Sequence, residues 1–206
     1  MLDRLAAVAS ALLVGACAVV GVRSGTEEPR FDLLGTEAGL EIRRYAPRLA
    51  AETIVGGDEA AARSEGFSRL ARYIFGGNQG AARIAMTAPV AQEPTRIAMT
   101  APVAQDATAE GYRIRFFLPA TLRDPPAPQD ARVTIAEVPG ETVAVLRFSG
   151  VPSPDAVAQA RARLFAALPA TSWVASGEPI GWFYDPPWTI PAMRRNEIAV
   201  PVAPRS

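Results

Sequence analysis

Histidine is absent from the 206-residue chain. This absence removes the commonest general base and the commonest transition-metal ligand of proteins. The chain also holds a single cysteine, Cys17, so an intramolecular disulfide and a thiolate metal cluster are both excluded. Serine–histidine triads, papain-like dyads and histidine-rich zinc sites are therefore ruled out, and any chemistry of this protein proceeds without imidazole.

The chain has no excess of charge of either sign. Acidic and basic side chains number 21 each, so no overall field directs the protein towards nucleic acid, and we expect no nucleic-acid partner. Hydrophobic residues make up 49% and charged residues 20% of the chain, which is ordinary for a globular protein. The length suits one medium-sized domain, or two small halves packed as one.

The N-terminal segment is apolar but short. Residues 5–16 are apolar or small, and they follow the basic Arg4. A transmembrane helix needs about 20 such residues, whereas this run has the length of the hydrophobic region of a signal peptide. The run ends in Val14-Gly15-Ala16-Cys17, which is similar to a bacterial lipobox, where the cysteine is diacylated before cleavage.

These features predict a lipoprotein signal peptide over residues 1–16, a lipidated Cys17 with a flexible tether over 17–30, and a globular domain over 31–206. Each buried acyl CH₂ contributes about 0.8 kcal/mol to membrane binding, so several chains on one cysteine would hold the protein stably in the cell envelope. Ala18 follows the cysteine in place of aspartate, which favours the outer membrane, facing the periplasm, over the inner membrane. The alternative is a short buried helix with a chance cysteine.

The remainder of the chain repeats one pattern twice. The first copy has expected strands over 40–45, 49–55 and 112–118 and a helix over 59–75; the second has strands over 132–138, 142–148, 181–184 and 197–202 and a helix from Pro154. A shift of 93 residues places Val55 on Phe148 and Gly57 on Gly150. The pattern predicts an α+β fold of duplicated ββαββ units, with two helices covering a mostly antiparallel sheet.

Local signals mark the two expected helices. Asp58 and Ser153 are suited to cap their N-termini, and Pro154 suits a first helical position. Gly66 lies inside the first helix, where glycine costs up to about 1 kcal/mol relative to alanine. We therefore expect a close packing contact at Gly66.

A ten-residue motif, RIAMTAPVAQ, occurs at residues 83–92 and again at 96–105. The two copies either pair as a hairpin or leave one copy as a loop. Pro89 and Pro102 cannot donate a ladder hydrogen bond, so each copy is expected to lie at an edge or to end its strand. The sequence leaves open which copy forms the core strand.

Several ordered motifs resemble the SOUL/haem-binding protein family. The segment 73–78, YIFGGN, followed by IAMTAPV at 84–90, resembles the signature of that family. Further matching blocks are RFFLP at 115–119, VLRFSG at 145–150, YDPPW at 184–188 and RRNE at 194–197. The resemblance runs in order from about Phe31 to Val202. It implies duplicated units that form a twisted, barrel-like antiparallel sheet flanked by two helices.

The resemblance also implies non-covalent binding of haem or a related tetrapyrrole in an apolar groove. Some relatives are thought to ligate the iron through histidine, which this chain lacks. Apolar contact and salt links to the propionates remain as the mode of binding. Without an iron bond we expect an affinity on the order of micromolar, about −8 kcal/mol.

The resemblance points to seven candidate ligand-binding residues. Three arginines are candidates for pairing with propionates, two aromatic residues for stacking on the macrocycle, and two methionines for ligand contact or a thioether bond to iron. They are Arg63, Arg69 and Arg72; Tyr73 and Phe75; and Met86 and Met99. Each has an ordinary alternative: a solvated helix face for the arginines, and core packing for the others. Trp182 and Trp188 are expected to pack on the core.

Other functions remain as alternatives. A related fold occurs in effector-binding domains of bacterial regulators, so the ligand could be a different small apolar molecule, and an interaction protein with no ligand is also open. Carboxylates for a hydrolase are present at Glu41, Glu52, Glu65, Asp185 and Glu197, but no pair has a spacing that indicates shared acid–base work. We expect no enzymatic activity, no catalytic residues and no protein-bound metal site.

Overall fold

A computed structural model describes residues 26–96 and 110–205, and in these residues one antiparallel sheet carries two α-helices. The expected Cys17 and Met99 features lie outside the described residues. The strands are β1 Phe31–Glu37, β2 Leu40–Tyr45, β3 Arg48–Gly56, β4 Val90–Arg96, β5 Glu110–Phe117, β6 Thr134–Val138, β7 Glu141–Phe148, β8 Trp173–Ala175, β9 Ile180–Phe183 and β10 Asn196–Pro204. The helices are α2 Glu59–Ile74 and α3 Pro154–Ala167, with short 3₁₀ turns at Leu168–Ala170 and Pro191–Met193.

The strand order confirms the duplication expected from sequence. The order is β1-β2-β7-β10-β9-β4-β5-β3-β6, with β8 attached to β10. The first unit is β2-β3-α2-β4-β5 and the second is β6-β7-α3-β9-β10. When each strand is replaced by its counterpart in the other unit, the order from β2 to β6 is the same read from the opposite end. The two units therefore meet about an approximate twofold axis between β4 and β9, while β1 and β8 are additions that the sequence pattern did not predict.

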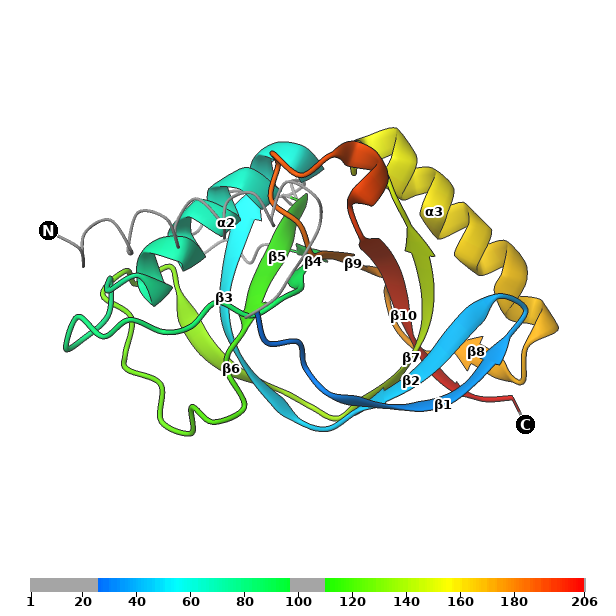
Figure 1. Cartoon of the computed structure of the whole chain (residues 1–206), viewed down its shortest axis with the longest axis horizontal. Helices are drawn as coiled ribbons and strands as arrows, with labels where there is room; N and C mark the ends of the chain where they lie inside the picture. The colour runs from blue at the N-terminus through cyan, green and yellow to red at the C-terminus, as the bar shows by residue number, and fades with distance from the viewer. Residues whose placement is uncertain (1–25, 97–109, 206) are drawn as a thin grey trace, which may run out of the picture.

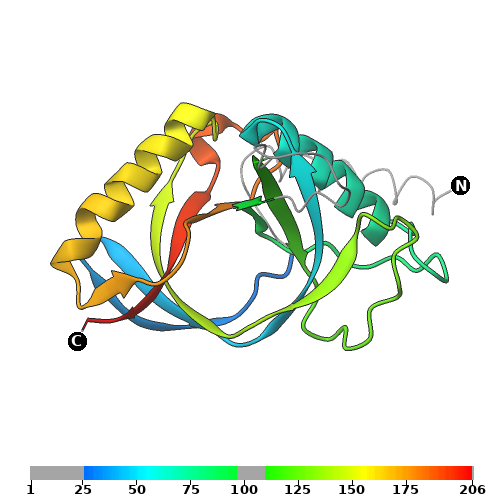
Figure 2. The ribbon, with the colours of Figure 1, turned by 180° about the vertical axis from the view of Figure 1, so that it is seen from behind.

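The sheet bends into an open trough rather than closing on itself (Figures 1 and 2). The helix α2 packs on β3 and β5, and α3 packs on β7 and β10, both on the outer side of the trough. Within the described residues, no helix is both long and apolar enough to cross a membrane.

Three apolar clusters follow from strand alternation. In β7, Ala144 and Leu146 belong to the cluster beneath α3, whereas Val143 and Val145 face the trough. In β5, Phe116 lies beneath α2 and Phe117 lies in the trough. Because successive strand residues point to opposite faces, each strand of the bend serves both a helix-covered core and the inner surface.

The helix signals are confirmed by the structure. Asp58 accepts hydrogen bonds from the backbone N–H groups of the first turn of α2, and Ser153 caps α3 through Ala156. At Gly66, an added Cβ would lie 2.4 Å from Ile114 Cγ1. This contact explains a glycine in mid-helix, because only a hydrogen leaves room for β5 to pack closely.

The first RIAMTAPVAQ copy supplies a central strand. Residues 90–92 begin β4 and pair with both β5 and β9, and Pro89 directly precedes the strand, as expected for a residue that cannot donate to a ladder. The second copy starts at Arg96, the last residue of β4, and its remainder lies outside the described residues.

Candidate functional site

The inner face of the trough is unusually polar for a sheet interior. Between its apolar residues it carries nine charged side chains, contributed by six strands and paired across them: Glu41, Arg43, Arg48, Glu52, Glu93, Arg113, Arg115, Glu141 and Glu197. Burying charges costs free energy unless they are paired and hydrogen-bonded. The pairs form two groups, one centred on Glu197 and one on Glu93.

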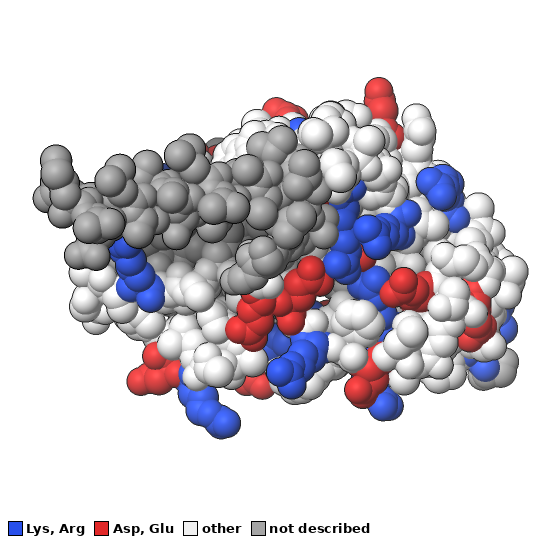
Figure 3. All heavy atoms as spheres, viewed as in Figure 1, with Lys and Arg blue, Asp and Glu red and all other residues white. Residues whose placement is uncertain are grey.

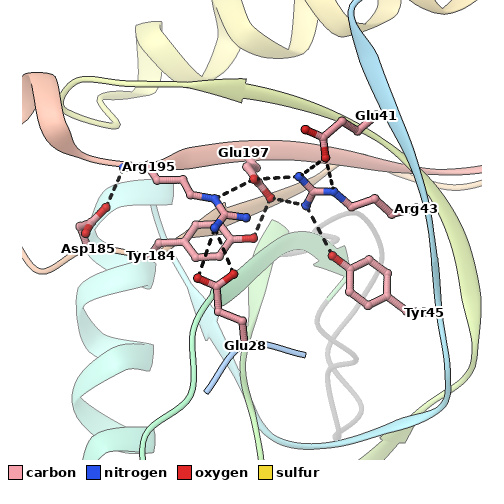
Figure 4. Close-up of polar contacts among 8 residues, drawn as sticks. All are labelled: Glu28, Glu41, Arg43, Tyr45, Tyr184, Asp185, Arg195 and Glu197. Carbon is pink, nitrogen blue, oxygen red and sulfur yellow. Dashed lines mark hydrogen bonds and ion pairs between the residues drawn. The ribbon is translucent and has the colours of Figure 1, made fainter. Parts of the chain in front are cut away.

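Glu197, on β10, is fully buried and accepts four hydrogen bonds. Arg43 donates through both terminal nitrogens, at 2.8 and 3.1 Å. The Tyr184 hydroxyl donates at 2.6 Å and Arg195 Nε at 2.9 Å. Figure 4 shows Arg43 between Glu197 and Glu41, so one carboxylate links strands β2 and β10 with the segment that follows β9.

Electrostatics favour the ionised form of Glu197. Burial raises its pKa, but the hydrogen bonds and charge of Arg43, the Tyr184 hydroxyl and the charge of Arg195 outweigh burial, so the pKa lies below its ordinary value. Burial, followed by the Glu197 charge, raises the pKa of Tyr184, which keeps the phenol protonated as a donor. This group therefore acts as a fixed ionic cross-link.

The second charged group surrounds Glu93 and Glu52. Arg115 lies 2.9 Å from both of these carboxylates, and Arg113 lies 2.7 Å from Glu93. Arg48 pairs with Glu141 across the trough. Burial lowers the pKa of Arg48 and raises that of Glu141, with their mutual attraction opposing both shifts.

A cavity of about 320 Å³ opens beside this second group. Its wall combines two aromatic rings, small apolar residues and five charged side chains: Ala91, Glu93, Arg113, Arg115, Phe117, Val138, Pro139, Glu141, Glu178, Ile180, Trp182 and Pro201. Trp182 also contacts the Tyr45 ring edge-on, with centroids 5.5 Å apart. The volume is at the lower end of ligand pockets, which span about 300–1,000 Å³.

A separate apolar surface lies on two loops at the N-terminal ends of the helices. Val151, Trp188, Ile190 and Met193 are between 44% and 64% exposed. The two loops that carry them are joined by a bond from Gly150 N–H to the Pro191 carbonyl, 2.9 Å long. We call these four residues the loop surface. Single exposed apolar side chains are common, whereas contiguous apolar patches mark binding surfaces; here the bond between the two loops holds the backbones that carry the four residues close together.

The loop surface is held in place by arginines. Arg194 donates to the carbonyls of Thr189 and Pro187, which fixes the turn that presents Trp188. Arg63, on α2, donates to the Pro152 carbonyl at 3.0 Å, next to Val151. The positioning of these loops therefore depends on hydrogen bonds rather than on burial of their apolar side chains.

The three candidate arginines of α2 do not converge on one place. Arg63 is half-buried, stacks on Phe183 with 4.4 Å to the ring centroid, and borders the loop surface. Arg69 pairs with Glu65 at 2.8 Å. Arg72 is exposed and donates to a carbonyl one turn earlier. None of the three lines the cavity, and their role in binding stays a prediction.

The candidate aromatic and methionine residues are also separated. Tyr73, in the last turn of α2, is buried in the apolar cluster between that helix and the sheet, and its hydroxyl donates to the Pro126 carbonyl at 2.9 Å. Phe75 is 63% exposed, and Met86 packs partly buried against the α2 cluster. The expectation that Trp188 packs on the core is wrong: it is 64% exposed, because the proline-rich turn at 186–187 directs it outward, whereas Trp182 is buried as expected.

Sequence reasoning missed the Glu197 group and the cavity. The sequence placed Glu197 at the start of the last strand, before the apolar run Ile198–Val200, and gave it no partner. A carboxylate at the start of a buried strand signals a buried partner. The partner, Arg43, lies on β2, 154 residues away in sequence, and only the sheet topology brings the two together.

The residues present fit a tetrapyrrole in part. The absence of histidine excludes imidazole ligation of iron, and among the described residues no cluster of acidic side chains has the arrangement of a metal site. Met193, on the loop surface, is an exposed thioether, which is a known type of iron ligand. The loop surface is therefore suited to contact the apolar face of a macrocycle. The cavity, at about 320 Å³, is smaller than a whole tetrapyrrole.

Comparisons with known proteins give both a family and a fold. The family described as SOUL heme-binding protein matches residues 26–201. A search of curated proteins found no match. Among solved structures, the EcmrR C-terminal domain is similar with a TM-score of 0.57 and 11% identity, over 80% of this chain and 97% of that one. An uncharacterised conserved protein and a hydrolase, both from Listeria innocua, give TM-scores of 0.54 and 0.52 at 11% and 12% identity, each over 82% of this chain and 94% of theirs. At such identities these structures show the fold alone.

Proposed function

Because the chain belongs to the SOUL haem-binding protein family, we propose that it binds haem or a related tetrapyrrole without histidine ligation, at the loop surface. The observation that carries the proposal is the exposure of Val151, Trp188, Ile190 and Met193 on two hydrogen-bonded loops. A flat macrocycle would cover these side chains together. The ligand would bind mainly through apolar contact, with Trp188 as the stacking partner.

The expected affinity follows from buried apolar surface. Fully burying a large apolar side chain contributes about 1.5–3 kcal/mol, so covering four that are half exposed contributes roughly 1 kcal/mol each, and the apolar faces of the ligand add a comparable amount. Association itself costs several kcal/mol. The two apolar terms sum to about 8 kcal/mol before the association cost is subtracted, so a micromolar dissociation constant, about −8 kcal/mol, requires contacts with the ligand beyond these four side chains.

Charge argues against the cavity as the tetrapyrrole site. Haem carries two propionates, and the cavity wall carries three carboxylates against two guanidinium groups, Arg113 and Arg115, which are already paired with Glu93. A dianionic ligand would have to displace these pairs. The loop surface presents no carboxylate among its four residues, and Arg63 borders it.

When bound, haem would supply an iron centre that this chain cannot ligate through imidazole, since it has no histidine. Met193 is the residue of the loop surface that could offer a thioether to that iron. Because apolar contact supplies most of the binding free energy, metal-free protoporphyrin should bind within about tenfold of haem.

Absorbance titration of the domain with haem and with protoporphyrin IX tests the proposal. Trp188→Ala and Met193→Ala should each weaken both ligands by about five- to tenfold, since each removes contact area worth roughly 1 kcal/mol. Phe165→Ala, which removes an aromatic side chain that is 40% exposed on α3, is the control and should have no effect. Phe75→Ala tests the end of α2 as an alternative site. A non-saturating response with both ligands would exclude the proposal.

A second part of the proposal concerns location. The lipobox-like Val14–Cys17 segment supports lipid attachment at Cys17, and Ala18 favours the outer membrane. Expression in a bacterial host with a labelled fatty acid should give a labelled membrane protein, and Cys17→Ala should abolish both the label and the membrane association. An unlabelled Cys17 chain would contradict the anchor while leaving the binding proposal untouched.

Two alternatives remain for the binding function: a different small apolar ligand at the same surface, or a protein partner. Covalent chemistry is not part of the proposal. The carboxylates Glu52, Glu93 and Glu197 are each bonded to guanidinium groups, which is suited to cross-linking strands rather than to transferring protons.

A further inference from the structure

We infer that the cavity inside the trough is a second binding site, distinct from the loop surface, for a small planar aromatic cation that carries a hydrogen-bond acceptor. The inference goes beyond the tetrapyrrole proposal and does not depend on it. None of the four loop-surface residues lines the cavity. The two sites also differ in chemistry, because one is apolar and the other is charged.

The cavity is bounded by aromatic rings. Phe117 and Trp182 contribute to its wall, and both residues are nearly fully buried, at 4% and 1% exposed. The guanidinium of Arg48 already lies over the faces of Phe117 and Tyr45, with 4.4 and 4.2 Å to the ring centroids. This stacking shows that rings on the inner face accept a cation.

The charge balance of the cavity favours a positive ligand. Its wall has three carboxylates and two guanidinium groups. The wall therefore has an excess of one negative charge. Arg48 pairs with Glu141 and Glu52 pairs with Arg115, so including these two neighbours adds one charge of each sign and leaves the excess unchanged. Glu178 is the exposed wall carboxylate, and it has no ion pair among the described residues. Acidic and basic side chains meet across the middle of the face in Figure 3.

The acceptor follows from Trp182. This residue is 1% exposed, lines the cavity, and its indole N–H has no hydrogen-bond partner among the described residues. An unpaired buried donor destabilises the folded protein, because it has lost its hydrogen bonds to water. A ligand oxygen in the cavity would remove that cost, which gives the site a preference for molecules that carry an acceptor.

Size limits the ligand further. A volume of about 320 Å³ accommodates roughly two or three fused rings, which is smaller than a tetrapyrrole. The predicted class is therefore a bicyclic or tricyclic heteroaromatic cation with an ether, hydroxyl or carbonyl oxygen.

Three quinoline probes of nearly equal size test the charge preference: 6-methoxy-1-methylquinolinium (positive), 6-methoxyquinoline (neutral at pH 7.5) and 6-methoxyquinoline-4-carboxylate (negative). Binding is followed in ¹H–¹⁵N spectra through the indole signals of the three tryptophans, assigned with Trp182→Phe. The Trp182 signal should shift saturably. The Trp173 signal, whose N–H donates to Glu37 at 3.1 Å, is the internal control. We expect the cation to bind at least fivefold more tightly than the neutral probe and tenfold more tightly than the anion.

Charge-reversal variants locate the site. Glu178→Lys should weaken binding of the cationic probe at least fivefold, whereas Glu137→Lys should leave it unchanged, since Glu137 is exposed on β6 and does not line the cavity. Neither variant should alter haem binding. The inference is overturned if no probe shifts Trp182 saturably, if the anion binds as tightly as the cation, or if Glu178→Lys has no effect. Weaker haem binding in Trp188→Ala, with an unchanged quinolinium affinity, would separate the two sites.

Discussion

Replacement of Glu197 by glutamine is the most direct perturbation of the polar interior. The wild-type carboxylate is fully buried and accepts four hydrogen bonds from three side chains, among them Arg43, which is itself 3% exposed. Glutamine keeps the size but removes the charge and turns an amide NH₂ towards these donors. Breaking a buried pair by neutralising one partner costs about 3–5 kcal/mol, because the other charge stays buried.

Urea unfolding followed by circular dichroism measures the change in the free energy of unfolding, with the slope m checked for constancy. Thermal unfolding followed by the same signal gives the change in Tm. A domain of this size loses about 2–4 °C in Tm per kcal/mol, so Glu197→Gln should lower Tm by roughly 6–20 °C. Glu65→Gln, which breaks the exposed i,i+4 pair with Arg69, is the control and should cost at most about 0.5 kcal/mol. The double variant Arg43→Met/Glu197→Met should be more stable than Glu197→Gln, because no charge of the central pair is left alone. A cost below about 1 kcal/mol for Glu197→Gln would refute the reasoning.

Three further outcomes are expected. Gly66→Ala should destabilise the protein by roughly 1–3 kcal/mol through overpacking against Ile114, although alanine is the better helix former; a neutral or stabilising result would contradict the contact. The pKa of Glu197 is lowered in the folded protein, so the stability that its ionised carboxylate contributes is complete above the ordinary pKa of 4.5 and is lost as the pH falls through the folded pKa. Acid titrations should therefore show a smaller loss of stability for Glu197→Gln than for wild type. Asn78→Ala should lower the free energy of unfolding by about 1–3 kcal/mol, measured by thermal unfolding. The buried side-chain amide of Asn78 donates to the backbone carbonyls of Tyr73 and Ala82, and these bonds would be lost.

Much of the fold was predictable because it depends on local periodicity. The alternation of strand residues and the three- to four-residue steps of the helices gave the principal elements to within a few residues, and the 93-residue repeat anticipated the twofold strand order. By contrast, β1 was missed: five of its seven residues are exposed, and the first four, Phe31 to Leu34, do not alternate in burial. β4 was missed because a duplicated motif with prolines does not show which copy pairs.

The candidate site was less predictable, for a physical reason. Side chains that function together here come from strands far apart in sequence, such as Arg43 with Glu197 and Arg48 with Glu141. Sequence spacing cannot reveal such pairs without the topology. The exposure of Trp188 was likewise hidden, since a tryptophan beside two prolines packs inward or outward depending on the neighbouring loop. The candidate arginines were correctly placed on a helix, but only Arg63 borders an apolar surface.

The central claim, histidine-independent tetrapyrrole binding at the loop surface, is tested most directly by parallel titrations of wild type, Trp188→Ala and Phe165→Ala with haem and protoporphyrin IX. We predict saturable one-to-one binding near micromolar affinity for both ligands, weakened about five- to tenfold in Trp188→Ala and unchanged in Phe165→Ala. Linear, non-saturating spectra for both ligands, or equal affinities in all three proteins, would contradict the claim.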